Sequence, residues 1–298
     1  MGKTAVAVAL AELLRRRGED SVAISADALQ VYEGLGTLTG APAAADLQRL
    51  EHRLIEFVPV TASYAVGEYM PRAHAEIDTA LAAGRRPIVV GGTGLYLRAA
   101  LCDLALRPPA PEALRAALER EAERAGVPAL HDRLVRLAPE AARSVDPNDR
   151  ARVLRRLELL EMGETPPGGG DDSQLWTDEL RVPTLLVGLM MERERLYARI
   201  DARAEAMAAA GAREEVLRAE AAGASPTARK ALGYEELLAG DLEAMKRRSR
   251  NYAKRQLTWM RKLAGAHVLD VTRSSSGEVA SEIVEIVVAQ ASPIVPRP

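Results

Sequence analysis

The segment "GKTAVAVAL" at residues 2–10 begins with Gly2-Lys3-Thr4 and continues into an alanine-rich stretch typical of a helix. Its first three residues match the second half of the pattern G-x-x-x-x-G-K-[ST], a loop whose backbone N–H groups surround a phosphate chain. In that pattern the lysine binds the phosphates, the threonine hydroxyl binds Mg²⁺, and the positive end of the helix attracts the phosphates. The sequence therefore predicts a phosphate-binding site at Gly2, Lys3 and Thr4, with Thr4 as a ligand of Mg²⁺.

The composition is that of a globular protein. Of the 298 residues, 48% are hydrophobic, which is enough for one large core or for a core and a smaller domain. No apolar run approaches the ~18 residues that a membrane span needs, and no secretory signal is recognisable. We therefore expect a cytoplasmic protein that does not bind membranes. The single cysteine, Cys102, is expected to be a small buried residue.

Short β-branched runs alternate with long alanine-rich stretches that favour helices. Runs at residues 21–25, 87–90, 184–189 and 267–271 have the pattern of parallel strands buried on both faces. Between the Pro-rich residues 108–111 and the Gly-rich residues 166–170 the pattern is helical only. We predict an α/β fold: a P-loop-like parallel sheet flanked by helices, formed by residues 1–107 and 171–298, and an all-helical insertion domain at residues 108–170.

In parallel sheets, ligands collect beyond the carboxyl ends of the strands. Asp27 directly follows the first run, where a carboxylate can act as a general base or hold the water shell of a metal ion. Capping the next helix is the alternative role for Asp27. Gly92-Thr93-Gly94 follows the second run, and the Thr93 hydroxyl is placed to donate to an anionic oxygen. An ordinary turn capped by Thr93 is the other interpretation.

Three arginines in the C-terminal part have helical spacing. Arg195, Arg199 and Arg203 are four residues apart, so one helix face would present several guanidinium groups to a polyphosphate. Pairing with Glu192 and Glu194 explains them equally well.

A second basic segment, residues 246–262, contains no acid and interleaves Tyr252 and Trp259 among its cations. A solvated helix face usually mixes charges of both signs, so this segment favours binding to a nucleic-acid backbone. Its two aromatic residues can equally be structural.

Together these motifs resemble those of one family, the bacterial tRNA dimethylallyltransferases. The shared motifs are, in chain order, Gly2-Lys3-Thr4, Ser25-Ala26-Asp27-Ala28-Leu29-Gln30-Val31-Tyr32, His52-Arg53-Leu54-Ile55, Gly91-Gly92-Thr93-Gly94-Leu95-Tyr96, Asp146-Pro147-Asn148-Asp149, Ala231-Leu232-Gly233-Tyr234 and K-R-Q-x-T-W-x-R at residues 254–261. Each motif is weak alone, but their order and spacing are specific and span nearly the whole chain.

The resemblance implies transfer of a dimethylallyl group from dimethylallyl diphosphate to N6 of the adenosine 3′ of the anticodon, in tRNAs that read codons starting with U. It implies that Asp27 is the general base and that Thr93 and Arg199 are catalytic. Gly2, Lys3, Thr4 with Mg²⁺, and Arg199 would bind the departing diphosphate. The adenosine must leave its stack to react, and the helical insertion and the basic segment would hold the anticodon stem-loop. We expect the enzyme to act as a monomer.

Contacts with tRNA are expected in the insertion, in the basic segment and around the candidate base. These positions are Asp27, Ala28, Leu29, Gln30, Thr93, Arg115, Ala151, Arg152, Val153, Leu154, Arg155, Arg250 and Lys254. The chain departs from the family at two places: Ala28 replaces a common serine, and residues 36–42 replace the usual G-T-A-K-P and lack its lysine. Both departures affect tRNA-facing positions.

Three other functions use some of the same motifs. A P-loop small-molecule kinase would share the sheet and the arginines, and an adenylate isopentenyltransferase would act on free nucleotides. A nonenzymatic RNA-binding protein would need the basic segment but not Asp27. Neither enzyme explains the basic segment as well as a tRNA substrate does.

Members of the family have a first strand and a complete glycine-rich loop before the Gly-Lys-Thr motif. We therefore expect that Met1 is not the natural start and that roughly ten or more residues precede it, the length of a short strand and its turn.

Overall fold

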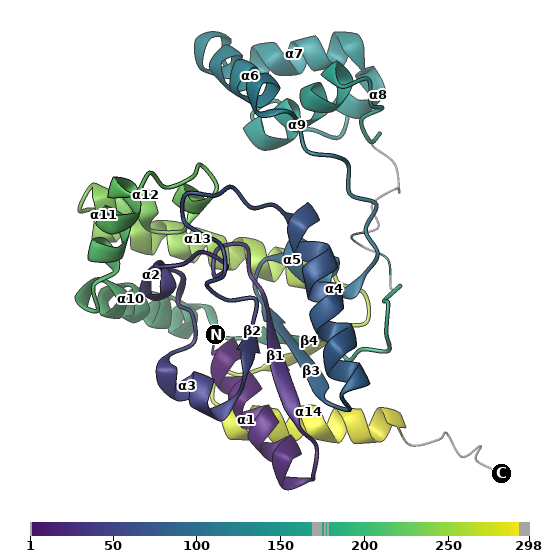
Figure 1. Cartoon of the computed structure of the whole chain (residues 1–298), viewed down its shortest axis with the longest axis vertical. Coiled ribbons are helices and arrows are strands. Elements are labelled where there is room, and N and C mark those ends of the chain that lie inside the picture. The colour runs from purple at the N-terminus through teal and green to yellow at the C-terminus, as the bar shows by residue number, and fades with distance from the viewer. Residues whose placement is uncertain (1, 169–174, 176, 178, 292–298) are drawn as a thin grey trace, which may run out of the picture. The chain divides into compact units, whose positions relative to one another are not determined.

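The chain folds into two compact units, Met1–Leu104 with Trp176–Pro298, and Ala105–Leu175 (Figure 1). The computed structural model describes residues 2–168, 175, 177 and 179–291. Met1 and the last two residues of the expected insertion, 169 and 170, lie outside the described residues. Of the residues that the structure describes, the first unit contains all five strands, and the second unit contains helices α6 to α9.

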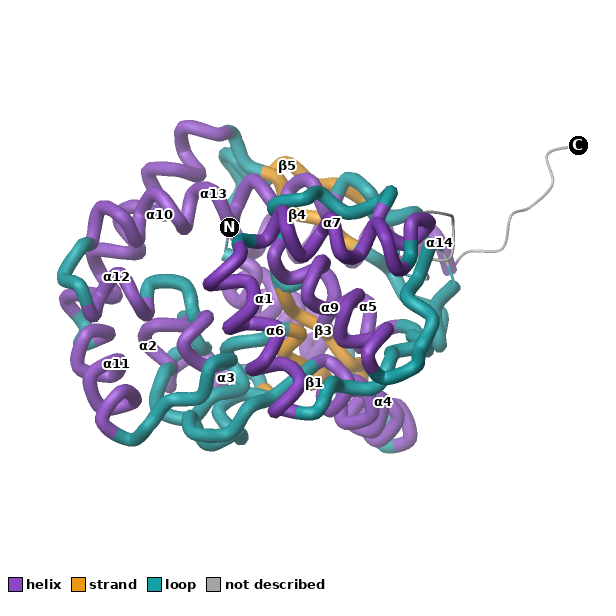
Figure 2. The backbone as a smooth tube through the Cα atoms, turned by 90° about the horizontal axis from the view of Figure 1, so that it is seen from above, coloured by secondary structure: helices purple, strands orange, loops and turns teal. Residues whose placement is uncertain are grey.

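The strands of the first unit are parallel, as predicted. One sheet has the order β2-β1-β3, with β1 at Ser21–Ala26, β2 at His52–Arg53 and β3 at Arg86–Gly91. Every residue of β1 is buried, including the small polar residues Ser21 and Ser25, which explains why apolar residues of this strand do not alternate with exposed polar ones. A second sheet pairs β4, Val187–Met190, with β5, His267–Asp270 (Figure 2). The two-residue strand β2 was not predicted because it is too short to give a periodic pattern.

The single sheet predicted from the sequence is present as two sheets. Strands β3 and β4 are edge strands, and residues of both line one apolar cavity of about 550 Å³. Residues 87–90 line it on the β3 side, and residues 184–189 line it on the β4 side. Within the described part of the chain, no strand lies between these two edges. The α/β class with parallel strands is confirmed, and the strands of the described residues are divided between two sheets.

Ten α-helices of the first unit are described. They are α1 (Lys3–Arg16), α2 (Gly36–Thr39), α3 (Ala44–Arg49), α4 (Val66–Ala82), α5 (Gly94–Leu101), α10 (Arg193–Ala209), α11 (Ala212–Ala221), α12 (Tyr234–Leu238), α13 (Leu242–Met260) and α14 (Ser276–Ala291). Helix α1 belongs to two hydrophobic clusters. Ala7, Val8 and Ala11 pack with β1, whereas Val6 packs with Leu189 of β4 and other core residues. The alanines of α1 let it lie close to the first sheet, so this helix connects the two sheets.

The second unit is a small helical domain with its own core. Its helices are α6 (Glu112–Ala125), α7 (Val127–Leu137), α8 (Pro139–Ala142) and α9 (Arg150–Glu161). Leu118, Leu130, Leu134, Val153 and Leu157 meet in that core. None of the helices in the described part of either unit is long and apolar enough to cross a membrane.

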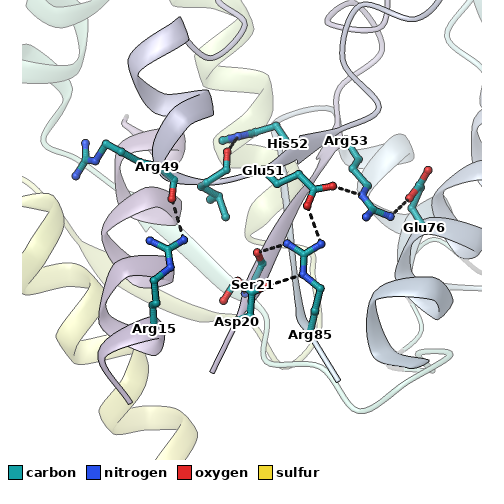
Figure 3. Close-up of polar contacts among 10 residues, drawn as sticks. Arg15, Asp20, Ser21, Arg49, Glu51, His52, Arg53, Glu76 and Arg85 are labelled. Atoms are coloured by element: carbon teal, nitrogen blue, oxygen red, sulfur yellow. Dashed lines mark hydrogen bonds and ion pairs between the residues drawn. The ribbon is translucent and has the colours of Figure 1, made fainter. Parts of the chain in front are cut away.

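A polar network joins the amino ends of the first sheet (Figure 3). Arg85, directly before β3, donates to Asp20, directly before β1, and to Glu51, directly before β2. Arg53 of β2 pairs with Glu51 and with Glu76 of α4. The arginine of the His52-Arg53-Leu54-Ile55 motif therefore has a structural role here, at the end of the sheet away from Asp27.

Candidate functional site

The candidate site lies at the carboxyl ends of β1 and β3. Ala26 and Gly91, the last residues of the two strands, are paired in register. Asp27 follows Ala26, and Gly92 and Thr93 follow Gly91, so parallel pairing brings the two predicted loops to one edge of the sheet.

Gly91 permits an unusually close approach of the two strand ends. A Cβ atom at position 91 would lie 2.1 Å from the carbonyl oxygen of Ala26. Any larger residue would push β1 and β3 apart at the point where Asp27 and Thr93 leave the sheet.

The carboxylate of Asp27 does not cap a helix. Its Oδ1 accepts a hydrogen bond of 3.0 Å from the backbone N–H of Leu29 and so closes a turn, and the next helix, α2, begins only at Gly36. The helix-cap alternative is therefore wrong. Nearby, the Gln30 side chain is held by the protein: its Oε1 accepts from Ser25 Oγ at 2.9 Å, and its Nε2 donates to the carbonyl of Gly40 at 3.1 Å.

Lys3 reaches the same edge from the start of α1. Its Nζ lies 3.2 Å from the place that a Cβ of Gly92 would occupy. Burial lowers the pKa of Lys3, whereas the charge of Asp27 raises it. Gly2, before α1, has a φ of 73°, a left-handed conformation that suits glycine. The first motif therefore lies beside the loop that follows β3.

Helix α10 contributes two of its three regularly spaced arginines. Arg199 Nη2 lies 3.7 Å from the place that a Cβ of Gly2 would occupy. Arg203 Nη2 donates to the carbonyl of Gly40 at 3.4 Å. Desolvation lowers the pKa of the Arg203 guanidinium, whereas the charge of Asp27 raises that pKa. Arg195 instead donates to the carbonyl of Thr272 at 2.5 Å, away from this group.

The structure adds Arg203 to the site residues chosen from the sequence. Its spacing of four from Arg199 was the available signal, but only the fold shows that Arg203 lies near Lys3 and Asp27 and that Arg199 lies near Gly2, whereas Arg195 does not.

Helix α13 packs against the loop that follows β3. The Thr93 Oγ1 and Tyr252 hydroxyl oxygens are 3.3 Å apart, and Gln256 Nε2 donates to the carbonyl of Gly92 at 2.8 Å. The Trp259 ring would be 2.1 Å from a Cβ on Gly94. Thr93 precedes α5 without a side-chain capping bond to it. The aromatic residues of the basic segment therefore have a structural role in holding this loop.

The acid-free segment is balanced by acids from other helices. Arg250 Nη1 pairs with Asp201 of α10 at 2.7 Å, and Arg248 Nη1 pairs with Glu236 of α12 at 2.8 Å. Lys254 Nζ donates to Asn251 at 3.3 Å. Acids on α10 and α12 therefore compensate part of the positive charge of residues 246–262.

The second unit presents only some of its predicted tRNA-contacting side chains. Arg115 is exposed on α6, and Ala151, Arg152 and the half-buried Arg155 lie on α9. The side chains of Val153 and Leu154 are buried in the core of the unit. Asp149, from the Asp146-Pro147-Asn148-Asp149 motif, accepts from the Arg152 N–H at 3.1 Å and caps α9.

Thr4 lies half-buried in the first turn of α1. Among the described residues, no three histidine, cysteine, aspartate or glutamate side chains come together as a metal site. Mg²⁺ commonly keeps several waters and binds through substrate phosphates and one or two protein oxygens. A single hydroxyl next to Lys3 fits that arrangement, so Thr4 suits a Mg²⁺ ion bound together with a diphosphate.

Known proteins resemble this chain along nearly its whole length. A family model described as IPP transferase matches residues 30–263. The tRNA dimethylallyltransferase of Rhodospirillum centenum is 41% identical over 281 residues, which cover 90% of this chain and 88% of that protein. The corresponding enzyme of Geobacter sulfurreducens is 39% identical over 272 residues, 88% of this chain and 86% of that protein. The crystal structure of the tRNA isopentenylpyrophosphate transferase from Bacillus halodurans superposes with a TM-score of 0.68 at 31% identity, covering 97% of this chain and 92% of that one. The chain therefore belongs to the IPP transferase family.

Proposed function

We propose that this protein transfers a dimethylallyl group from dimethylallyl diphosphate to N6 of the adenosine 3′ of the anticodon, in tRNAs that read codons starting with U. The curated relatives carry the name tRNA dimethylallyltransferase. One observation carries the proposal: a carboxylate, Asp27, lies at the strand ends beside the cations Lys3 and Arg203. A base next to a site for anionic leaving groups is what this transfer needs.

The reaction forms one bond and breaks one. The N6 lone pair of adenosine is delocalised into the purine, so the amine attacks poorly unless its proton is removed. In the proposed step the nitrogen bonds to C1 of the dimethylallyl group, the C1–O bond to the diphosphate breaks, and an N6 proton passes to the carboxylate of Asp27.

The cations stabilise the charge that develops on the leaving diphosphate. We assign this role to Lys3, Arg199 and Arg203, with the Thr93 hydroxyl as a further donor. Mg²⁺ held by Thr4 and the diphosphate would neutralise part of the same charge. Burial lowers the pKa of Lys3, and the negative charge of a bound substrate would raise it again. Substrate binding would therefore favour the charged form of Lys3.

Binding of the RNA is assigned to exposed groups. The adenosine must leave its stack to reach Asp27, and Arg115, Arg152 and Arg155 in the second unit are suited to phosphates of the anticodon stem-loop. We propose that the enzyme acts as a monomer. A tRNA substrate also favours a cytoplasmic location.

The test supplies dimethylallyl diphosphate and Mg²⁺ together with anticodon stem-loop RNA, AMP or no acceptor, and follows diphosphate release and acceptor mass. We expect release and prenylated product with the RNA only. Transfer to AMP would favour an adenylate isopentenyltransferase, and ATP hydrolysis without prenyl transfer would favour a kinase. RNA binding without any reaction would refute the enzyme assignment.

A further inference from the structure

The second unit contains a buried carboxylate on α9. The side chain of Glu158 is 2% exposed, and within the described part of the chain it is the only acidic residue classed as buried. An isolated buried carboxylate is unfavourable, so such a group is normally paired and hydrogen-bonded. The partners of Glu158 therefore indicate why it is there.

Each oxygen of Glu158 faces a different arginine. Oε2 accepts from Arg155 Nη1, one turn earlier on α9, at 3.1 Å. Oε1 lies 3.8 Å from Arg115 Nη1 on α6. These two arginines are 34% and 52% exposed, so a buried anion holds two cations that solvent still reaches.

Arg155 is also fixed on its other side. Its Nη2 donates to the carbonyl of Arg107 at 3.1 Å and to that of Pro108 at 2.7 Å. Its planar guanidinium is thus held between α9 and the segment that leads into α6, which determines the orientation of the plane. Arg115 has a second partner, Glu119, at 3.2 Å on the exposed side of α6.

We propose that Glu158 is a positioning residue that holds Arg115 and Arg155 in one orientation, so that both guanidinium groups meet phosphates of the same RNA. Two guanidinium groups face two carboxylates, the buried Glu158 and the exposed Glu119, so Glu158 holds the arginines from the inside while their outer sides stay open to solvent. Long side chains held in place lose less conformational freedom when they bind. The inference rests on the proposed function, because it takes the ligand of these arginines to be RNA.

Glu158→Gln tests the proposal, since it keeps the size of the side chain and removes its charge. We expect the affinity for anticodon stem-loop RNA to fall about tenfold, and the slope of log affinity against log salt to decrease by about one to two as phosphate contacts are lost. The KM for RNA should rise, while kcat and the KM for dimethylallyl diphosphate stay near wild type. If the role of Glu158 were purely structural, a variant whose second unit is still folded, as judged by circular dichroism, would keep the salt slope of the wild type.

Glu161→Gln is the matched control, because Glu161 lies on the same helix but pairs with Arg133. It should leave RNA affinity unchanged. If Glu158→Gln does not fold, Glu158→Leu, which removes the charge and keeps an apolar filling, is measured in the same way, because the two arginines that lose their partner are partly exposed and stay hydrated. An unchanged salt slope and KM in a folded variant would overturn the proposal.

A double-mutant cycle separates this inference from the proposed function. If Arg115→Gln and Arg155→Gln each weaken RNA binding, but their effects simply add to that of Glu158→Gln, the arginines bind RNA and the positioning role is wrong. If neither arginine variant changes RNA affinity, the assignment of RNA to this surface is wrong as well. Coupling between the Glu158 and Arg115 substitutions is the expected result.

Discussion

Replacing Gly91 with alanine should damage the candidate site without touching any of its functional groups. The new Cβ would lie 2.1 Å from the carbonyl oxygen of Ala26 and 2.7 Å from the carbonyl carbon. Ordinary contact between such atoms is ~3.5 Å, so the strand ends must separate by roughly 1 Å. Because the clash is with backbone atoms, no side-chain rotation relieves it.

We expect Gly91→Ala to reduce the rate of transfer strongly and the stability of the protein only moderately. Overpacking of this kind costs about 1–3 kcal/mol, which for a domain of this size lowers the Tm by a few degrees. A displacement of about 1 Å between reacting groups can reduce the rate about 10²-fold. We therefore expect kcat for prenyl transfer to fall about 100-fold in a Gly91→Ala protein that is still folded at the assay temperature.

Gly67→Ala is the control for this substitution. Gly67 lies in α4, and apart from its chain neighbours and the backbone of its own helix no atom of the described residues comes within 4 Å of the place its Cβ would occupy. Alanine favours helices by up to ~1 kcal/mol over glycine, so this variant should be as stable as wild type or more stable, with an unchanged rate. A Gly91→Ala enzyme with wild-type Tm and kcat would refute the argument that the close approach of β1 and β3 sets the site geometry.

Three further variants address the chemistry and the RNA. Asp27→Asn should lower the transfer rate about 10²–10⁴-fold and leave RNA affinity in filter binding nearly unchanged; a wild-type turnover would exclude Asp27 as the base. The charged fraction of Lys3 decreases as the pH rises through its lowered pKa, so diphosphate affinity should weaken in that range; Lys3→Arg should flatten this pH dependence in titration calorimetry, and identical profiles would exclude Lys3 as the titrating group. Reversing Arg250 and Lys254 to glutamate should weaken RNA binding and lower its salt slope by about one unit per lost phosphate contact, with diphosphate binding hardly changed; an unchanged slope would assign both cations to structure alone.

The sequence alone predicted those features of the fold and of the site that depend on a local pattern of residues. The β-branched runs predicted β1 and β3, and the residues directly after them, Asp27 and Thr93, come to one edge because parallel strands align their carboxyl ends. Cys102 is buried, as its small apolar character indicated. The helical pattern after Pro111 corresponds to helices α6 to α9.

Features that depend on contacts between distant segments could not be predicted. Nothing near residue 250 in the sequence indicates that Asp201, 49 positions away, neutralises Arg250. The contact of Gln256 with Gly92 spans 164 positions and likewise has no local signature. Helical spacing grouped Arg195 with Arg199 and Arg203, but Thr272, in the loop between β5 and α14, binds Arg195 separately.

The cavity between β3 and β4 makes the first unit sensitive to hydrostatic pressure. Pressure favours the state of smaller volume, and unfolding removes internal voids, so destabilisation increases with the void volume that is lost. The cavity of about 550 Å³ is partly open to solvent, so pressure acts on the part that water does not fill, and the wall includes the indole of Trp259, which also packs on Gly94. Compression would therefore act on the same wall that holds the loop after β3.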